Sequence, residues 1–507
     1  MNKVSAPNLH LFAYQLRDSL TAENKPVEGA ENLWHKCNEI LNKLKTNLTR
    51  LRIYGYEEEA ADSPLKNIYI PRNEPEGDII NLHKKELIGF EKKVEIEEEN
   101  SEKKPIKITA IIQPRRIYDS YLLYFNIRRP EKDGNTPISI FEKLNPDGIF
   151  LSENIQSTLG QTLLITADIP SEEKAEDIAK LCLENLISAP EKRPPLKHKG
   201  RLFGSLIFEY ESLNPREHIL IWLFSDINHR KKFEECYGKF QKLFCYRNKI
   251  ITSFKQYQKH YEATYKNYGE IENTITEINK LLSPNKGEIE KAIPQSNKLV
   301  APNNRNTNLS ENLLSGLKEK VKSLPKLALE QAQNLRDLEH EKNTIIINTK
   351  NYLLTLEEIR KMLPENTFYT DLSFLETFGK ETAPYYQQRI QYKSDYFVHG
   401  KSLLDQSLAS IRGIVEIEEA ERDKSLQNQI QALAAGIGVA STIAGSSGHL
   451  PIDKPVIIPV LNTPLRYPFL PKPIHPFVNS VMISLLAGWL TYLAVSRIIN
   501  KKNRPKK

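Results

Sequence analysis

Two long uncharged runs stand out in the hydrophobic pattern near the end of the chain. Residues 430–447 and 477–496 contain no Asp, Glu, Lys or Arg, and each has about the length, roughly 20 residues, that a helix needs to cross a bilayer core. The stretch 448–476 between them is rich in Pro, and 497–507 holds six Lys and Arg residues, which marks the cytoplasmic side. The pattern predicts two transmembrane helices, an outer loop and a basic tail, in a multi-pass protein of the cell inner (plasma) membrane with both termini in the cytoplasm.

The two uncharged runs differ in the size of their side chains. Residues 477–496 are mostly large and apolar, whereas 430–447 are dominated by Ala, Gly and Ser. Small residues let helices approach closely, so we expect the first run to pack against copies of itself or to line a cavity. The alternative, a buried Ala- and Gly-rich helix in a protein without membrane spans, stays open at this point.

Strand-like composition is concentrated in the first half of the chain. Five runs are β-rich or continuously apolar: 106–113, 118–128, 160–167, 201–210 and 219–224. The short connection between the first two predicts a hairpin. We therefore predict a cytoplasmic α/β domain over 105–226 with at least five strands, preceded by a helical or irregular region, 1–104.

Helical periodicity follows the predicted sheet. A mostly apolar row runs at sevenfold spacing from Phe233 to Leu282, with Arg247 as a charged member, and such a row is typical of a coiled-coil seam. We predict a long helical hairpin over 229–363 and a stalk helix over 385–429 that leads into the first uncharged run.

The predicted stalk carries a cluster of charges just before that run. Its five acids are Glu416, Glu418, Glu419, Glu421 and Asp423. In a symmetric bundle of helices these acids would form an inner charge ring, and rings of carboxylates concentrate cations. A solvated helix face near a membrane surface explains the same charges, and both interpretations stay open.

Charge and motifs narrow the classes of function. The formal net charge is +7, and the tail alone supplies six positive groups, so the rest of the chain is near neutral and we expect no nucleic-acid partner. The four Cys residues lack C-x-x-C spacing, and the chain has no Gly-rich phosphate loop, G-x-S-x-G or H-E-x-x-H sequence. His198 and His218 are isolated and are expected to be surface or core residues. We expect neither catalytic activity nor a bound cofactor.

The order of elements over about 105–507 resembles that of the CorA-like family of divalent-metal channels. The local likeness is at the end of the first uncharged run, where the family commonly has an Ile-Ala-Gly step followed closely by a Gly-Met-Asn signature. Here 443–445 read Ile-Ala-Gly, and Gly448, His449 and Leu450 follow at the outer mouth. Gly448 matches the signature, whereas His449 and Leu450 stand in place of Met and Asn, so selectivity for Mg²⁺ does not carry over from the family.

The resemblance implies a homopentamer with the first span around the axis. Carried over to this sequence, the pore face consists of Gln427, Ile430, Ala434, Gly438, Ser441 and Gly445. The implied function is a homo-oligomeric membrane channel or transporter for cations, with Mg²⁺ or another divalent cation as transported or regulatory ion, gated by the cytoplasmic domain. The partners would be further copies of the chain and the lipid bilayer.

Two alternatives remain beside the channel. Some divergent relatives are associated with prokaryotic antiviral systems, so the chain is also a candidate for a signal-gated membrane effector that responds to a small nucleotide. A non-conducting, membrane-anchored coiled-coil scaffold would use the same long helices. In each case the predicted fold class is α+β: a cytoplasmic α/β sheet domain followed by long coiled-coil helices, a stalk helix and two C-terminal transmembrane helices.

Overall fold

The computed structural model describes most of the first 397 residues and three short pieces of the remainder. The described residues are 3–18, 27–46, 48, 53, 79–83, 85, 87–97, 103–213, 216–282, 311–363, 371–397, 409, 457–458 and 463–464. Contacts divide the chain into two units, Met1–Tyr261 with Arg336–Lys393 and Glu262–Leu335 with Ser394–Lys507. The first unit contains the large sheet.

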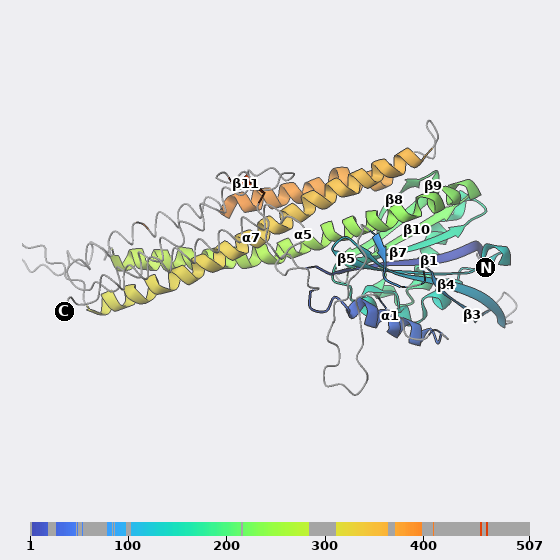
Figure 1. Cartoon of the computed structure of the whole chain (residues 1–507), viewed down its shortest axis with the longest axis horizontal. Coiled ribbons are helices and arrows are strands. Elements are labelled where there is room, and N and C mark those ends of the chain that lie inside the picture. Colours follow the sequence, from blue (N-terminus) through green and yellow to red (C-terminus); the bar gives the residue numbers. More distant parts are fainter. Residues whose placement is uncertain are drawn as a thin grey trace, which may run out of the picture. The chain divides into compact units, whose positions relative to one another are not determined.

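A mixed sheet of ten strands forms the centre of the first unit (Figure 1). Its strands are β1 (Lys3–Leu16), β2 (Ile79–Asn81), β3 (Ile88–Glu97), β4 (Lys103–Ile117), β5 (Ser120–Arg128), β6 (Thr136–Pro137), β7 (Gly160–Asp168), β8 (Leu196–Leu202), β9 (Ser205–Leu213) and β10 (Arg216–Phe224). The order is β2-β4-β5-β1-β7-β10-β9-β8, with β3 also paired to β4 and β6 to β1. β7 and β10 run parallel, and their neighbours pair with them in the antiparallel sense.

Strand β1 lies in the middle of the sheet, between β5 and β7. Successive side chains of a strand point to opposite faces. Leu9 and Leu11 accordingly enter the hydrophobic cluster on one face, and Phe12 contacts the helix on the other face, where its ring lies 5.2 Å from that of Phe244. This arrangement corrects the expectation of a helical or irregular region over 1–104, because that region supplies three strands as well as a helix.

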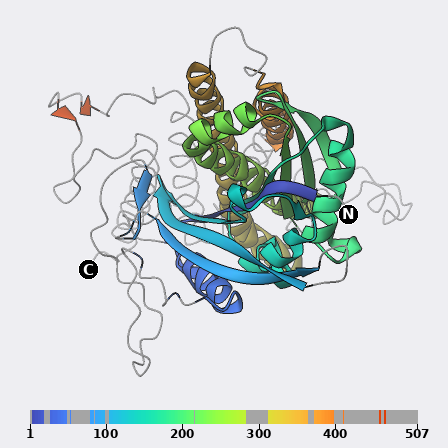
Figure 2. The ribbon, with the colours of Figure 1, turned by 90° about the vertical axis from the view of Figure 1, so that its right-hand side faces the viewer.

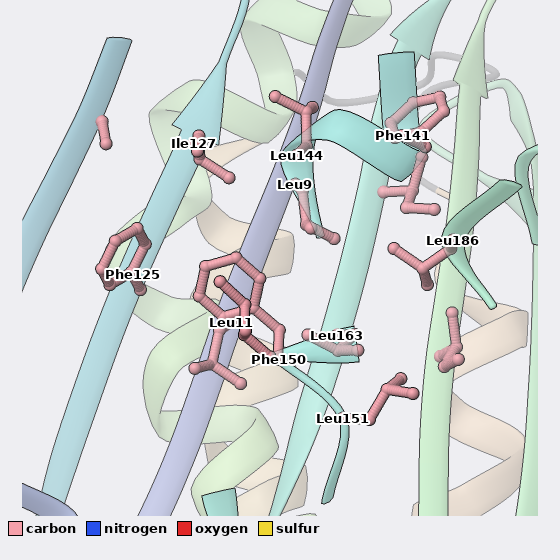
Figure 3. Packing of buried hydrophobic residues seen from close by; sticks show 14 of the residues in the cluster. Leu9, Leu11, Phe125, Ile127, Phe141, Leu144, Phe150, Leu151, Leu163 and Leu186 are labelled. Atoms are coloured by element: carbon pink, nitrogen blue, oxygen red, sulfur yellow. The ribbon is translucent and has the colours of Figure 1, made fainter. Parts of the chain in front are cut away.

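One face of the sheet is covered by short helices. These are α1 (Asn32–Lys43), α2 (Ile140–Leu144), α3 (Ser152–Ile155) and α4 (Ala175–Leu186), with the single turns η1 (Glu131–Asp133), η2 (Pro146–Gly148), η3 (Glu172–Lys174) and η4 (Pro190–Lys192) between them. Figure 2 shows α1 on this side of the sheet. Figure 3 shows Phe141, Leu144 and Leu186 packed with strand residues such as Leu9 and Phe125 in one hydrophobic core.

The opposite face is covered by the first half of α5 (Ile227–Leu282), a helix of 56 residues. The other helices are α7 (Glu311–Met362) and α8 (Ser373–Thr377), followed by the π-helical turn η7 (Phe378–Thr382) and helical residues 383–397. We call residues 372–393, which belong to the first unit, the cap segment. Trp222 of β10 packs against Phe233 and Phe240 of α5, so the first part of the aromatic row read as a coiled-coil seam packs on the sheet. Phe254, further along the same row, stacks on Tyr386 of the cap segment.

α5 and α7 run antiparallel in each unit. In the first unit Lys239 of α5 donates a hydrogen bond to Glu358 of α7 at 2.6 Å, and Ser253 of α5 is hydrogen-bonded to Glu341 of α7. The residue later in α5 thus meets the residue earlier in α7. In the second unit Asn267 donates to the carbonyl of Leu327 at 3.1 Å, and Glu277 pairs with Lys320. The expected helical hairpin is thus present as these two helices.

The predicted fold class with two C-terminal transmembrane helices, and the plasma-membrane localisation that follows from it, are corrected by the described residues. Among them, no helix combines the length and the apolar composition needed to cross a bilayer, because α5 and α7 carry Lys and Glu along their whole length. The predicted spans 430–447 and 477–496 and the tail 497–507 lie outside the described residues. Within 448–476, β11 (Ile457–Ile458) pairs with β12 (Thr463–Pro464).

Candidate functional site

A row of polar side chains crosses three strands on the face covered by α5. Ile219 of β10 pairs with Leu163 of β7, so the preceding residues His218 and Thr162 lie side by side, and His218 pairs with Glu211 of β9. Glu209 lies two residues before Glu211 and therefore points to the same face. His218, Thr162 and Glu211 are buried, in a part of the sheet whose other side chains are mostly apolar.

Arg247 of α5 joins the two acids of this row. Its Nη2 atom donates to Oε1 of Glu209 at 2.7 Å and to Oε1 of Glu211 at 2.8 Å. The guanidinium carbon lies 5.0 Å from the centre of the Phe378 ring, within the range of a cation–π contact. The buried side chain of Arg247 therefore links α5 to β9 and to the π-helical turn of the cap segment.

A directed chain of hydrogen bonds leads from α5 through the row. Asn248 Nδ2 donates to Thr162 Oγ1 at 3.1 Å, and the Thr162 hydroxyl can donate to His218 Nδ1 at 2.8 Å. His218 Nε2 then faces Glu209 Oε1 at 3.2 Å. An ionised carboxylate only accepts, so His218 carries its proton on Nε2 and accepts at Nδ1. We call Thr162, Glu209, Glu211, His218, Arg247 and Asn248 the charged cluster.

The charges of the cluster follow from burial and from Arg247. Burial, and next the positive charge of Arg247, lower the pKa of His218 to about 4, so the imidazole is neutral at pH 7. For Glu209, burial alone would raise the pKa, but Arg247 and the hydrogen bond from His218 outweigh it and hold that pKa well below its usual range. Burial would likewise raise the pKa of Glu211, but the positive charge of Arg247 and of its other neighbours outweighs burial and lowers that pKa to about 2.

Two further cations border the cluster. Lys197 lies at an irregularity in the pairing of β8 with β9 and forms an ion pair with Glu211. Arg216 donates to Oδ1 of Asn248 at 2.7 Å, and burial lowers its pKa to about 10, which leaves it charged at pH 7. Three cations thus face two carboxylates. Nη1 of Arg247 and Nε of Arg216 are buried and have no hydrogen-bond partner among the described residues.

The cap segment closes the cluster from the side opposite the sheet. Tyr352 of α7 donates to the carbonyl of Leu375 at 2.9 Å, and its ring lies 5.3 Å from that of Phe378. Tyr386 stacks on Phe254 of α5 with ring centres 4.0 Å apart and planes within 9°. Burial, and next the charge of Glu211, raise the pKa of Tyr386, which places its hydroxyl close to the cluster.

Outside the charged cluster, the described structure pairs a buried serine with a histidine. Ser205 Oγ lies 2.7 Å from His229 Nδ1, and both side chains are buried. In the same set of residues no group of three or more His, Cys, Asp or Glu side chains is arranged to hold a metal ion. The four cysteines, Cys37, Cys182, Cys236 and Cys245, are buried thiols.

The site residues predicted from the sequence stay predictions. The pore-face residues 427–445, the outer-mouth residues 448–450 and the acids of 416–423 all lie outside the described residues. The cluster was missed, although two signals were present: Glu209 lies in the predicted strand 201–210 with Glu211 one residue beyond its end, and Arg247 interrupts an apolar row. His218 is a core histidine as expected, but it is hydrogen-bonded to Thr162 rather than isolated.

Comparison with known proteins finds no family model, no curated protein and no solved structure that matches this chain.

Proposed function

We propose that the first unit is a regulatory module without catalytic activity, in which the charged cluster sets how firmly the sheet holds α5 and the cap segment. The observation that carries this proposal is the position of Arg247, which is shared between the two carboxylates of β9 and the ring of Phe378. A change at this one side chain alters the sheet, the long helix and the cap segment together.

Physical arguments favour a switch over a purely structural role. A buried ion pair gives little net stability compared with apolar packing, yet losing one partner costs about 3–5 kcal/mol, so breaking the contacts of Arg247 would change the stability of this region strongly. The adjacent π-helical turn is of a kind found frequently at functional sites. Release of Arg247 would free the cap segment at Phe378.

The signal that fits the cluster best is a small anion, and a nucleotide is one such ligand. Support comes from the excess of one positive charge over Arg247, Arg216, Lys197, Glu209 and Glu211, and from the two arginine N–H groups that have no partner among the described residues. An anionic group bound there would compete with Glu209 and Glu211 for Arg247 and would loosen its hold on the sheet.

Control of a cation channel by this domain, and the alternatives of a signal-gated effector or a scaffold, stay predictions. The pore face that conduction would need lies outside the described residues. The regulatory proposal does not depend on which of these outputs the long helices serve.

Hydrogen–deuterium exchange of the full chain tests the proposal. Arg247→Lys, which keeps the charge but loses the planar fork, and Arg247→Met should both speed exchange in the cap segment and in α5 near residue 247. The matched control is Arg201→Met, which removes an ion pair with Glu172 outside the cluster. Unchanged exchange of the cap segment in both Arg247 variants would overturn the proposal.

A further inference from the structure

The outer face of α7 in the first unit exposes large apolar side chains that neither α5 nor the cap segment covers. Ile346 is 41% exposed, Ile347 54%, Leu354 49% and Met362 43%. Singly exposed apolar residues are common on protein surfaces, but these four share one helix within 17 residues. At 100° per residue Ile347 and Leu354 lie about 20° apart, so these two share one line along the helix, and exposed apolar residues that gather in this way mark an interaction surface.

Contacts of α7 flank this face on two sides. Glu358 pairs with Lys239 of α5 on one side, and Thr349 accepts a hydrogen bond from Gln387 of the cap segment on another. Ile347, Lys350, Leu354 and Lys361 follow each other in steps of three, four and seven, so they form one stripe between these contacts.

The charges on this stripe are complementary to those of a second copy of the stripe that runs in the opposite direction. At 100° per residue, Lys350 and Glu357 lie on the same side of a line through Leu354, roughly 40° and 60° from it. Lys350 comes four residues before Leu354 and Glu357 three residues after it, and both are exposed. A two-fold axis beside Leu354 therefore brings each Lys350 close to the partner copy's acid at the same height along the helix.

We infer that the outer face of α7 pairs with the same face of a second copy of this chain, antiparallel and centred on Leu354. A two-fold interface uses one patch twice, and the placement of the charges around Leu354 meets that requirement. In the pair, Leu354 packs on Leu354, two Lys350–Glu357 ion pairs flank it, and Ile347 packs on the aliphatic stem of Lys361. One helix per copy is a small contact area, so the pairing is weak and concentration-dependent.

Cysteine cross-linking of the full chain tests both the contact and its direction. Leu354→Cys should form a disulfide-linked dimer under mild oxidation, because the two copies meet at this residue. Lys350→Cys alone should not, since the two positions lie about 12 Å apart along the axis, beyond disulfide reach. A mixture of Lys350→Cys and Glu357→Cys chains should cross-link between the two variants. The native cysteines are buried and give a low background.

A charge exchange supplies an independent readout by sedimentation. Lys350→Glu and Glu357→Lys should each raise the dissociation constant roughly tenfold, and the double variant should restore it, because both ion pairs re-form with reversed sign. Leu354→Glu should abolish the dimer, while Leu87→Glu, at an apolar residue 54% exposed elsewhere, should not. Cross-linking of Lys350→Cys to itself would show a parallel pairing, and no cross-linking of Leu354→Cys would show another occupant; either result overturns the inference.

Discussion

Glu217 of β10 provides the sharpest test of how the sheet is stabilised. It is buried on the face opposite the charged cluster, where its Oε1 accepts a hydrogen bond from the backbone N–H of Ser152 at 2.6 Å. By the β7–β10 register its neighbour is Gln161, whose Nε2 donates to the carbonyl of Phe150 at 2.7 Å. Oε2 of Glu217 and Oε1 of Gln161 are both buried without a hydrogen-bond partner among the described residues. Two acceptor oxygens cannot form a hydrogen bond with each other unless one of them carries a proton.

We expect a proton on Glu217 to resolve this conflict, with Oε2 donating to Oε1 of Gln161 on the neighbouring strand. Burial is the main cause that raises the pKa of Glu217 from 4.5 to about 7. The native domain therefore binds this proton more tightly than the unfolded chain does. Its contribution is complete below pH 4.5, declines as pH rises, and is lost above pH 7. At about 1.4 kcal/mol per pH unit, the loss amounts to about 3 kcal/mol.

Glu217→Gln should remove this loss. The amide can accept from Ser152 and donate to Gln161 at every pH, so the variant should match the wild type at pH 5 and exceed its free energy of unfolding at pH 8 by up to about 3 kcal/mol. Urea denaturation followed by tryptophan fluorescence measures this, since Trp34 and Trp222 are buried in the first unit. Glu153→Gln, at an exposed neighbour, is the matched control. A variant no more stable than the wild type at pH 8 would refute the reasoning.

Three further predictions concern the opposite face of the sheet. Arg247→Met should lower the free energy of unfolding by about 3–5 kcal/mol, because two buried carboxylates lose their partner, and a urea titration at pH 7 measures the loss. Gly379→Ala should lower the free energy of unfolding by about 1–3 kcal/mol, since the added Cβ would lie 2.8 Å from Leu353 and 2.9 Å from Tyr352. Gly238→Ala, whose Cβ meets open space, should raise it by up to about 1 kcal/mol. Thermal unfolding compares the two variants. His218→Gln should reduce the loss of stability between pH 6.5 and pH 4, because a histidine kept neutral by burial destabilises the native state when it must be charged.

The sequence predicted those parts of the fold whose pairing is local. β4 and β5 were expected as a hairpin, and they pair in register from Ile117 with Ser120 outward. β1 was missed because both of its faces are buried, so apolar and polar residues do not alternate along it, and because its partners β5 and β7 lie more than 100 residues away. Strand pairings over such separations leave no local signal.

The charged cluster was hidden for a related reason. Glu209 and Glu211 read as solvated residues unless a cation is known to meet them, and that cation, Arg247, is 36 residues further on, in a different element. The two acids and the arginine become buried together when α5 packs on the sheet. Their pairing is therefore visible in the folded structure and not in the sequence. The aromatic row of α5 predicted a packed helical seam. Its first part, at Phe233 and Phe240, packs on the sheet instead, whereas Phe254 further along the row stacks on a helical residue, Tyr386. Helical spacing identifies which face is buried and not what buries it.

Glu217 and His218, adjacent on β10, couple the two faces of the sheet to pH in opposite directions. The titration of His218 lowers the free energy of unfolding as pH falls from 6.5 to 4, and the titration of Glu217 lowers it as pH rises from 4.5 to 7. Between pH 4.5 and 6.5 the two groups therefore change the free energy of unfolding in opposite directions. His10, whose pKa burial lowers to about 3, adds to the first effect, and Glu341, whose pKa burial raises to about 7, adds to the second. The first unit should therefore be most stable in mildly acidic solution, with Glu217→Gln moving that optimum to higher pH and His218→Gln moving it lower. A shift of both variants in the same direction would show that the two groups do not titrate independently across the strand.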